Sequence, residues 1–473
     1  MSTETTDTPV FKKDIVSKKK MASFSVGPFM NSFILSTFQL LIFYYYEVEL
    51  GLATFLVGLS FVIYAIWNMI NDPLIGYLTD KPMRWSKKYG MRTPWVFIGA
   101  ISSIICFYFL FSVPTDTDVK SNPWPIFWYM VIITCLLDTG FSLFTTHFIG
   151  GFGNIFRTNE QRRKGSLISV FTAALAQIIL FIGLVPGIIV TGDPSSYSRF
   201  ALVATIILAI ALILFIPGIY ENEFVRNRYL QIYEYLETQK IPYFKFLKTT
   251  FKQKNYMIWS AAYTLITTAN VLNFTSMLYF LIHVLKADIQ AIQIFSFAFF
   301  LTFLPSNIIM SHFVAKKKSP VNSAVIGAFL ITIYYLSLLW ITNLTQLFLF
   351  ATVGGVATGA FGCVYMYMIS DTMDEVNVAC GRHVEAGLVG IQNFFVRAAF
   401  LAVGIIIAGV HIATGYVPNS VEQTELATWG IRLHTGLFSG IFSFIAAILL
   451  LKFYDLKGEK KEQLIAAMRK LGI

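Results

Sequence analysis

Asp72 is the side chain in this sequence with the clearest capacity for chemistry, because it lies inside an apolar stretch. A carboxylate at membrane depth costs about 2.5–3.5 kcal/mol on insertion scales. Asn68 lies one helical turn before Asp72, so the two side chains share a face. Pro73 removes a backbone donor beside them and can free carbonyl oxygens. The carboxylate, amide and carbonyl oxygens in this segment together indicate a binding site for a monovalent cation or a proton. The alternative is a carboxylate at the cytoplasmic helix end that caps or pairs and binds nothing.

A second polar face is predicted where Asp138, Ser142 and Thr145 recur at helical spacing in another apolar segment. Asp138 can supply a further carboxylate to the same cavity, or it can lie nearer the outer surface and be hydrated. Arg397 lies well inside a third apolar segment and requires a partner or water there. Asp72, Asp138 or an anionic substrate can neutralise the guanidinium. The alternative is a side chain that extends to the inner interface.

The elements that must position these residues are membrane-spanning helices. Of the 473 residues, 56% are hydrophobic and 13% are charged, whereas soluble domains carry about 25% charged residues. A bilayer-spanning helix needs about 20 mostly apolar residues. Twelve stretches meet this condition, which predicts an all-α polytopic membrane protein. They run near 24–46, 51–79, 94–113, 125–153, 165–191, 198–218, 257–283, 290–313, 321–341, 345–369, 385–413 and 430–453.

The basic residues give an independent test of this map, because cytoplasmic loops hold the excess of Lys and Arg. With the N-terminus inside, 31 of the 36 basic residues fall in cytoplasmic segments and four fall outside. Both termini are therefore expected in the cytoplasm, and the protein in the cytoplasmic (plasma) membrane. The net charge of +10 agrees with a surface that faces anionic inner-leaflet lipid, so nucleic acid is not expected as a partner.

The chain divides into two halves around a long polar segment. Residues 1–23 are predicted as a cytoplasmic tail, 24–218 as a six-helix bundle, 219–256 as a cytoplasmic linker, 257–453 as a second six-helix bundle and 454–473 as a cytoplasmic tail. This layout resembles the major facilitator fold, in which substrate binds near the midplane between halves that rock about it. No strong sequence repeat relates the two halves.

Charged loops at the inner ends of the spans are candidates for gating. Segment 80–95 mixes acidic and basic groups, and its counterpart 370–385 carries three acids in five residues. Ion pairs between the acids of the second half and basic loops of the first would stabilise an outward-facing state. The alternative is a positive-inside anchor with no gating role. The residues predicted to take part are Asp80, Arg84, Arg92, Arg162, Asp371 and Asp374.

Several segments together resemble the glycoside–pentoside–hexuronide:cation symporter family. They are Trp67 to Gly76, Arg84-Trp85 with Pro94-Trp95, Ser370 to Asp374, Gln392 with Arg397, and Gly415 to Asn419. The resemblance implies symport of a sugar or glycoside-like solute with Na+ or H+ by alternating access. It implies cation binding by Asp72, Asn68, Asn71, Ser142 and Thr145, and substrate binding by Asn31, Ser32, Asp138, Ile149, Gln392 and Arg397.

Some family positions are changed in this sequence. The family offers two acids on its second helix, and Asn68 stands in place of the first. Ile149 stands where sugar-transporting members have a stacking tryptophan, and Ser32 where they have a sugar-binding acid. Na+ and H+ therefore both stay open as coupling ions. An amphipathic or lysolipid-like substrate and an uncoupled uniporter are alternatives to sugar symport.

Motifs for soluble enzyme chemistry are absent from the sequence. There is no Walker-type loop, no dinucleotide-binding glycine pattern and no His/Cys metal cluster. The sequence therefore predicts transport driven by a gradient, without enzyme activity and without a cofactor. The expected partners are membrane lipid, a small-molecule substrate and a monovalent cation or proton, and a monomer is expected.

Overall fold

The computed structural model describes residues 16–79, 83–114, 119, 121–156, 159–221, 223, 226, 243–317, 320–381, 384–418, 420 and 422–471. Twelve helices within these residues are long and apolar enough to cross a membrane. The predicted all-α fold with twelve spans is therefore confirmed. Asp80 and half of the predicted linker 219–256 lie outside the described residues.

The first six spans follow one another with short connections. Proline lies in the first turn of α5, α6 and α9, where a missing backbone donor costs nothing. The bounds are α1 Lys18–Phe24, α2 Val26–Tyr44 and η2 Tyr45–Glu49 for the first span, α3 Thr54–Thr79, α4 Ser86–Tyr89 in a loop, α5 Thr93–Leu110, α6 Trp124–Ile155, α7 Asn159–Ile178 with η3 Ile179–Leu184 and α8 Val185–Ile188, and α9 Pro194–Ile219.

The last six spans begin after a short helix of the predicted linker, α11 Tyr243–Phe251. The remaining bounds are α12 Lys254–Tyr279 with η4 Phe280–Val284, η5 Ile289–Ala291 with α13 Ile292–Lys317, α14 Pro320–Ser337, α15 Leu344–Gly362 and α16 Tyr365–Cys380, α17 Glu385–Thr414, α18 Glu425–Arg432 with η6 Leu433–Leu437 and α19 Phe438–Lys452, and α20 Glu459–Leu471.

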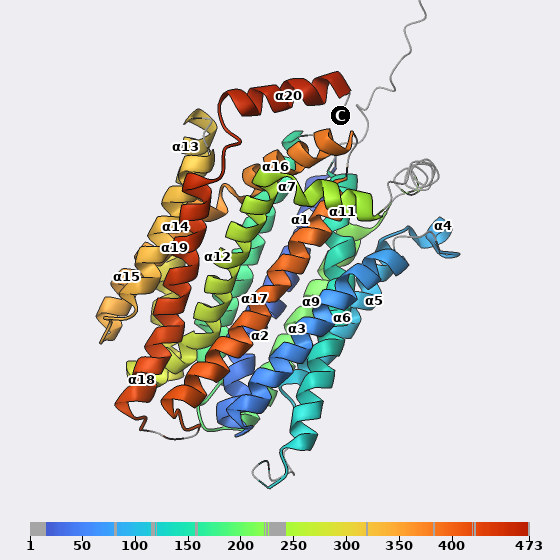
Figure 1. The fold of residues 1–473 in the computed structure, drawn as a ribbon. Coiled ribbons are helices and arrows are strands. Elements are labelled where there is room, and N and C mark those ends of the chain that lie inside the picture. Colours follow the sequence, from blue (N-terminus) through green and yellow to red (C-terminus); the bar gives the residue numbers. More distant parts are fainter. Residues whose placement is uncertain are drawn as a thin grey trace, which may run out of the picture.

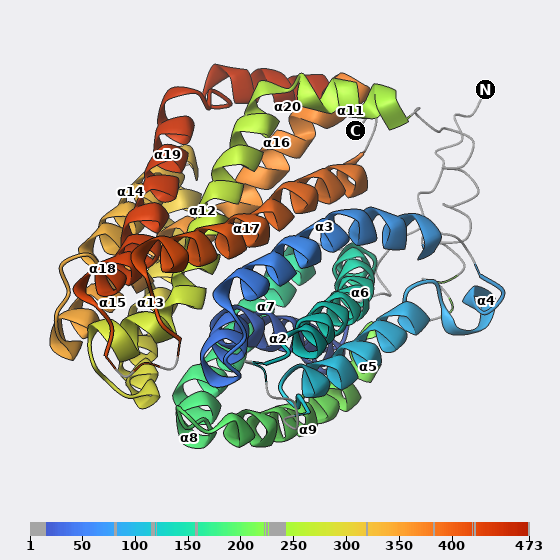
Figure 2. The ribbon, with the colours of Figure 1, turned by 60° about the horizontal axis from the view of Figure 1, so that its bottom comes forward.

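The two sets of spans lie side by side. Figure 2 shows the helices of the first set (blue to green) beside those of the second (yellow-green to red), with α3 next to α17 where the sets meet. Between the sets, α3 packs on α17, α2 on α12, and α7 and η3 on α13. Figure 1 shows α20, α11 and α16 at one end of the molecule and α18 at the other. The basic residues predict that the α20 end is cytoplasmic.

The contact between α3 and α17 is made through glycines. A β-carbon added at Gly58 would lie 2.6 Å from the β-carbon of Ala408. One added at Gly404 would lie 2.5 Å from the β-carbon of Phe61. Small residues let two helices approach closely in a membrane, so the seam between the two sets is tight at this level.

The first and seventh spans end in the same backbone turn. Leu50 N–H donates to the Tyr45 carbonyl over 3.0 Å, and Leu285 N–H donates to the Phe280 carbonyl over 3.1 Å. Each π-helical turn is followed by a residue with positive φ, which is 73° at Gly51 and 51° at Lys286. The turn is thus repeated in both halves, although the sequences of the halves show no strong repeat.

The predicted loop 370–385 is helical over most of its length, which corrects the sequence-based boundary of the tenth span. α16 extends to Cys380 and ends at Gly381, whose φ is 68°. Met368, Met373 and Val376 of this helix are buried in the protein. The acids of α16 therefore lower the mean hydropathy of this segment, although the helix continues through them.

Candidate functional site

A buried carboxylate, Asp138 of α6, lies at the centre of the predicted site. Only 3% of its surface is exposed. Three side chains of α3 donate to it: Asn68 Nδ2 over 2.7 Å, Asn71 Nδ2 over 3.3 Å and the Tyr64 hydroxyl over 3.4 Å. Neutral donors satisfy the carboxylate oxygens but leave its charge uncompensated within this group.

Asp72 and Arg397 form an ion pair across the seam between the halves. Arg397 Nε of α17 lies 2.9 Å from Asp72 Oδ2 of α3, and the two side chains are 14% and 15% exposed. The sequence left Asp72, Asp138 and a substrate as possible partners of this guanidinium, and the structure pairs it with Asp72. No described residue accepts a hydrogen bond from the two terminal nitrogens of Arg397.

Three buried oxygens of this region have no hydrogen-bond partner in the described part of the chain. They are Oδ1 of Asn68 and Oδ1 of Asp72 on α3, and Oγ of Ser142 on α6. Asn68 and Asp72 are four residues apart, and Ser142 follows Asp138 by four, so each pair shares a helix face. Buried polar atoms are rarely left unpaired, and a bound ion or water commonly explains them. The oxygens are of the kind that hard cations prefer.

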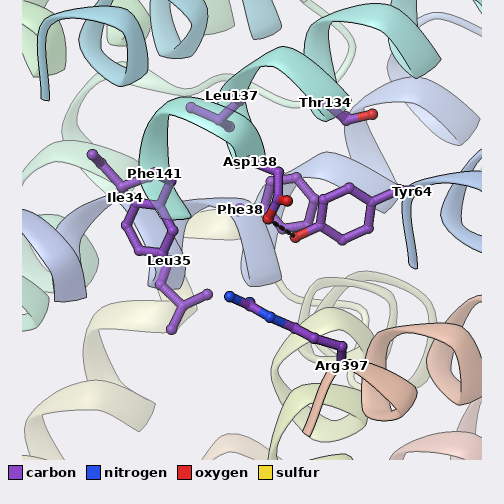
Figure 3. Close-up of a pocket in the computed structure, with 9 residues that line it drawn as sticks. All are labelled: Ile34, Leu35, Phe38, Tyr64, Thr134, Leu137, Asp138, Phe141 and Arg397. Carbon is purple, nitrogen blue, oxygen red and sulfur yellow. Dashed lines mark hydrogen bonds between the residues drawn. The ribbon is translucent and has the colours of Figure 1, made fainter. Parts of the chain in front are cut away.

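A small pocket opens beside Asp138 and Arg397 (Figure 3). The guanidinium extends into it toward Leu35, and a hydrogen bond joins Tyr64 to Asp138. The pocket has room for about one or two water molecules, so a solute needs movement of the helices to enter it. Most of the lining is apolar. The lining residues are Ile34, Leu35, Phe38, Tyr64, Thr134, Leu137, Asp138, Phe141 and Arg397.

The other predicted binding residues lie outside this pocket lining. Asn31 and Ser32 are half-buried on α2. The Thr145 hydroxyl donates to the Ser142 carbonyl of its own helix over 3.4 Å. Ile149 is 57% exposed. Gln392 is buried in the second half, where its Oε1 accepts from Ser260 Oγ over 2.9 Å and its amide nitrogen has no partner among the described residues.

Tyr64 is a site residue that the sequence reasoning missed. It lines the pocket and contacts both Asp138 and Asn68. A signal for it was present, because Tyr64, Asn68 and Asp72 recur at four-residue intervals on one helix face.

Two predicted gating residues of the first half, Arg84 and Arg92, precede α5 in the chain. Arg84 is exposed. The Arg92 backbone N–H donates to Glu221 Oε2 over 3.3 Å, and its side chain packs against Gly150 of α6. Burial raises the pKa of Glu221, and hydrogen bonds from backbone N–H groups partly offset this. The side chain of Arg162 lies outside the described residues, as does Asp80.

The predicted pairing of Asp371 with basic loops of the first half, which was assigned to an outward-facing state, is not the contact that this structure contains. Asp371 Oδ2 lies 2.5 Å from Lys461 Nζ of α20. The physical reason is that α20 folds back along α16 in the same half, so a lysine is already close. Asp374 lies on α16 one turn after Asp371.

The described residues contain no group of three His, Cys, Asp or Glu side chains placed to hold a metal ion. The site therefore consists of carboxylate, amide, hydroxyl and guanidinium groups at the junction of α3, α6 and α17.

Comparisons with solved structures show the same fold. A peptide transporter POT superposes with a TM-score of 0.61 at 12% identity, covering 94% of this chain and 95% of that chain. A POT family transporter in complex with 5-aminolevulinic acid superposes with a TM-score of 0.63 at 10% identity, covering 92% and 96%.

Two curated proteins match parts of the chain. An uncharacterized symporter of Synechocystis sp. is 26% identical over 166 residues, which are 34% of this chain and 29% of that protein. The sodium-dependent lysophosphatidylcholine symporter 1-A of Danio rerio is 26% identical over 100 residues, which are 21% and 17% of the two chains. The matched segments thus span less than a third of either relative.

A family model described as MFS/sugar transport protein matches residues 23–458, nearly the whole chain. It agrees with the twelve spans, with the superposed transporters and with the resemblance found in the sequence. The chain belongs to this family of major facilitator transporters, and it is an integral membrane transporter rather than an enzyme.

Proposed function

We propose that this protein is a Na+-coupled symporter of a small polar solute, a sugar or glycoside-like compound, in the plasma membrane with both termini in the cytoplasm. The observation that carries the proposal is the Asp72–Arg397 pair between the halves, next to buried oxygens that have no partner among the described residues. Charged groups inside a membrane bundle mark ion and substrate pathways.

The arrangement supplies a mechanism for coupling. A cation that binds the unpartnered oxygens of Asn68, Asp72 and Ser142 competes with Arg397 for the Asp72 carboxylate. The guanidinium is then free to donate to hydroxyl or anionic groups of the solute. Asp138, which already faces the same pocket, accepts from a solute hydroxyl. Solute and cation each favour the state in which the other binds, which is the thermodynamic requirement for coupling.

The choice of Na+ follows from the chemistry of the oxygens. Carboxylate, amide and hydroxyl oxygens together suit a hard cation, whereas a proton needs only one carboxylate. The lysophosphatidylcholine symporter of Danio rerio is named sodium-dependent, which supports the same choice here. Proton coupling is the outcome that would replace it.

A second candidate substrate is an amphipathic solute with an anionic head group. The apolar lining of the pocket favours it, with Phe38 and Phe141 on two of the helices that surround Arg397. The name of the Danio rerio relative supports the same class. An apolar chain would lie against these rings while the head group bound Arg397.

The first experiment is thermal unfolding of the purified protein in NaCl and in choline chloride, for the wild type and for Asp72→Asn. A cation that binds only the folded state stabilises it by about 2.7 kcal/mol at 100 times its dissociation constant. We expect a Na+-specific rise in Tm for the wild type that is absent from Asp72→Asn. A rise of equal size in both proteins would contradict the assignment of the site to Asp72.

Counterflow in proteoliposomes then distinguishes the substrates. Vesicles loaded with a glycoside or with a lysolipid are tested for exchange with the labelled compound, with and without Na+. Exchange of a glycoside supports the leading proposal, and exchange of a lysolipid alone replaces it with the second candidate. Net uptake that is independent of both Na+ and pH would establish a uniporter instead.

A further inference from the structure

A second group of buried ionisable side chains joins the two halves at the end opposite α20. Glu47 lies in η2 at the end of the first span and is 0% exposed. His411 of α17 and His434 of η6 belong to the second half and are 1% and 0% exposed. His411 Nδ1 lies 3.0 Å from Glu47 Oε1, and His411 Nε2 lies 3.2 Å from His434 Nε2. We call Glu47, His411 and His434 the outer cluster.

Neutral side chains complete the hydrogen bonds of the outer cluster. Thr54 Oγ1 donates to Glu47 Oε1 over 2.6 Å, and the hydroxyl of Tyr279 donates to Glu47 Oε2. Ser276 Oγ lies 2.6 Å from His434 Nδ1. Every polar atom of the cluster therefore has a partner, and the partners come from α3 and α12 as well as from the cluster itself.

Other titratable groups face the outer cluster from each neighbouring element. Tyr416 stacks on His411 with ring centroids 4.2 Å apart, and its hydroxyl lies 3.0 Å from His283 Nε2. Tyr44 of α2 is the next group beside Glu47. Glu49 points elsewhere, because its oxygens accept from Gly192 N–H and the Tyr197 hydroxyl. Among the described neighbours, Glu47 is thus the carboxylate and the histidines are the bases.

The outer cluster can hold its hydrogen bonds with no excess proton. His411 then donates from Nδ1 to the Glu47 carboxylate and accepts at Nε2 from His434 Nε2–H, while His434 Nδ1 accepts from the Ser276 hydroxyl. Both rings are neutral, and the tautomers follow from the partners. The cluster carries one negative charge in this state, and the charge is fully buried.

The same atoms can hold one more proton without moving. His411 then donates from both nitrogens, to Glu47 and to His434 Nε2, and His434 donates from Nδ1 to Ser276 Oγ. Only the tautomer of His434 changes. The cluster is now a carboxylate beside an imidazolium, with no net charge. Burying such a pair costs far less than burying a single charge, so the closed arrangement favours the protonated form.

We propose that the outer cluster is a proton-binding site that latches the outer ends of the two halves together. Glu47 comes from the first half and both histidines come from the second, so the outer ends cannot separate without breaking the Glu47–His411 contact. Once the outer ends separate, water solvates both groups and the preference for the shared proton is lost. The ligand is a proton and not a metal, since no metal-binding group of three such side chains occurs among the described residues.

The sign of the pH dependence follows from this linkage. Because the closed arrangement holds the shared proton and the separated groups do not, a lower pH favours the closed, folded protein. That stabilisation is lost as the pH rises and the shared proton leaves. The Tm of the wild type is therefore expected to fall by several degrees between pH 6 and pH 8.5. The measurement is made in choline chloride so that no Na+ binds the proposed site at Asp72.

Glu47→Gln and His411→Gln are the test variants, and His147→Gln is the matched control. His147 is also a buried histidine, but it contacts Thr79 on α3 and no carboxylate among the described residues. We expect a flat pH profile for both test variants and an unchanged profile for the control. A flat profile for the wild type, or an unchanged profile for Glu47→Gln, would overturn the proposal.

A second measurement reports the separation of the outer ends directly. Ile407 is 0% exposed and lies one turn from His411 on the same face of α17. A cysteine replacing Ile407 is alkylated, and the labelled peptide is measured by mass spectrometry against the same peptide in unfolded protein at each pH. Because one proton shifts the equilibrium by up to tenfold per pH unit, the normalised rate is expected to rise from pH 6.5 to pH 8.5 by up to about a hundredfold. Adding Glu47→Gln should abolish that rise, and a rise that persists in this background would overturn the proposal.

Discussion

Removing only one partner of the Asp72–Arg397 pair is predicted to lower the free energy of unfolding substantially. Asp72→Asn leaves the buried Arg397 guanidinium without its carboxylate, and breaking a buried pair in this way costs about 3–5 kcal/mol. Arg397→Gln leaves the Asp72 carboxylate unpaired and is expected to cost a similar amount. The free energy of unfolding in choline chloride measures both.

The double variant Asp72→Asn/Arg397→Gln is the control for this prediction. With neither charge present, it is expected to be more stable than the sum of the two single effects by at least about 1 kcal/mol. Strictly additive effects would mean that the two side chains do not interact in the resting protein.

Replacing Ser142 by alanine is predicted to lower the affinity for the cation. Its hydroxyl oxygen is buried without a partner in the described part of the chain, so Ser142→Ala removes a candidate ligand and leaves no other bond unmade. The Na+ concentration that gives half-maximal thermal stabilisation is expected to rise about tenfold, which corresponds to about 1.4 kcal/mol. Ser103→Ala is the matched control, because Ser103 is equally buried but bonds the Gly99 carbonyl of its own helix. Equal effects of the two changes would argue against Ser142 as a ligand.

Single residues of the site at the junction of α3, α6 and α17 stand out in the sequence, whereas those of the outer cluster do not. Asp72, Asp138 and Arg397 stand out because a charge in an apolar stretch is costly wherever the helices go. Glu47 lies at the end of its span, where the sequence alone predicts a residue at the membrane surface. His411 lies 364 residues away from it, so only the packing of α2 against the second half brings the two together. The contact of Asp371 with Lys461 was missed for the same reason, since the sequence alone does not place α20 against α16.

At the scale of elements, the turn repeated after the first and seventh spans predicts the effect of two substitutions. Lys286 has a φ of 51° at the position that Gly51 occupies in the first half. A left-handed conformation costs a residue with a β-carbon about 1 kcal/mol relative to glycine. Lys286→Gly is therefore expected to stabilise the protein by about that amount, and Gly51→Ala to destabilise it by as much. Thermal unfolding measures both, and a loss of stability in Lys286→Gly would contradict the argument.

α20 is predicted to be held by ion pairs at two points. Lys461 bonds Asp371 of α16, and Lys460 and Lys254 bond Asp455 just before the helix. Lys461→Ala is expected to raise the hydrogen-exchange rate of α20 severalfold, because half-exposed pairs contribute up to about 1 kcal/mol. Lys457→Ala, which alters an exposed lysine outside these pairs, is the control. Equal exchange in the two variants would show that packing alone holds α20.

Acid is expected to loosen the same helix. The Lys460 ammonium, opposed by partial burial and aided by Lys254, lowers the pKa of Asp455 to about 2. A carboxyl whose folded pKa is depressed stabilises the fold above its unfolded value of about 3.9, and this contribution is lost as the pH falls toward 2. Hydrogen exchange of α20 should therefore be unchanged from pH 7 to pH 5 after correction for the intrinsic rate, and should increase only below about pH 4.

Span number was predictable, and helix ends were not. Hydropathy finds every span because lipid selects for apolar residues along the whole length of each helix. The tenth span was predicted too short because α16 carries Asp371, Asp374 and Glu375, although Met368 and Val376 of the same helix are buried. A polar face at the membrane surface lowers mean hydropathy in the same way as a loop does.

At the scale of the whole molecule, the orientation in the membrane is a prediction that labelling can test. The distribution of basic residues places α4 in the cytoplasm and the turn at Asp288 outside. Both Lys87 and Asp288 are exposed. A cysteine replacing Asp288 should react with a membrane-impermeant maleimide in intact cells, and one replacing Lys87 only after permeabilisation. The reverse result would invert the orientation and place the outer cluster on the cytoplasmic side.

The glycine contact between α3 and α17 has a consequence for the speed of the molecule. Gly58 and Gly404 bring the two helices together with few side chains interleaved at this level. Surfaces of this kind adhere through many weak contacts, and the two glycines themselves have no side chain to withdraw. The friction of rocking is then low even though the resting contact is tight. A bulkier residue at either glycine would slow the exchange between facing states as well as shift it.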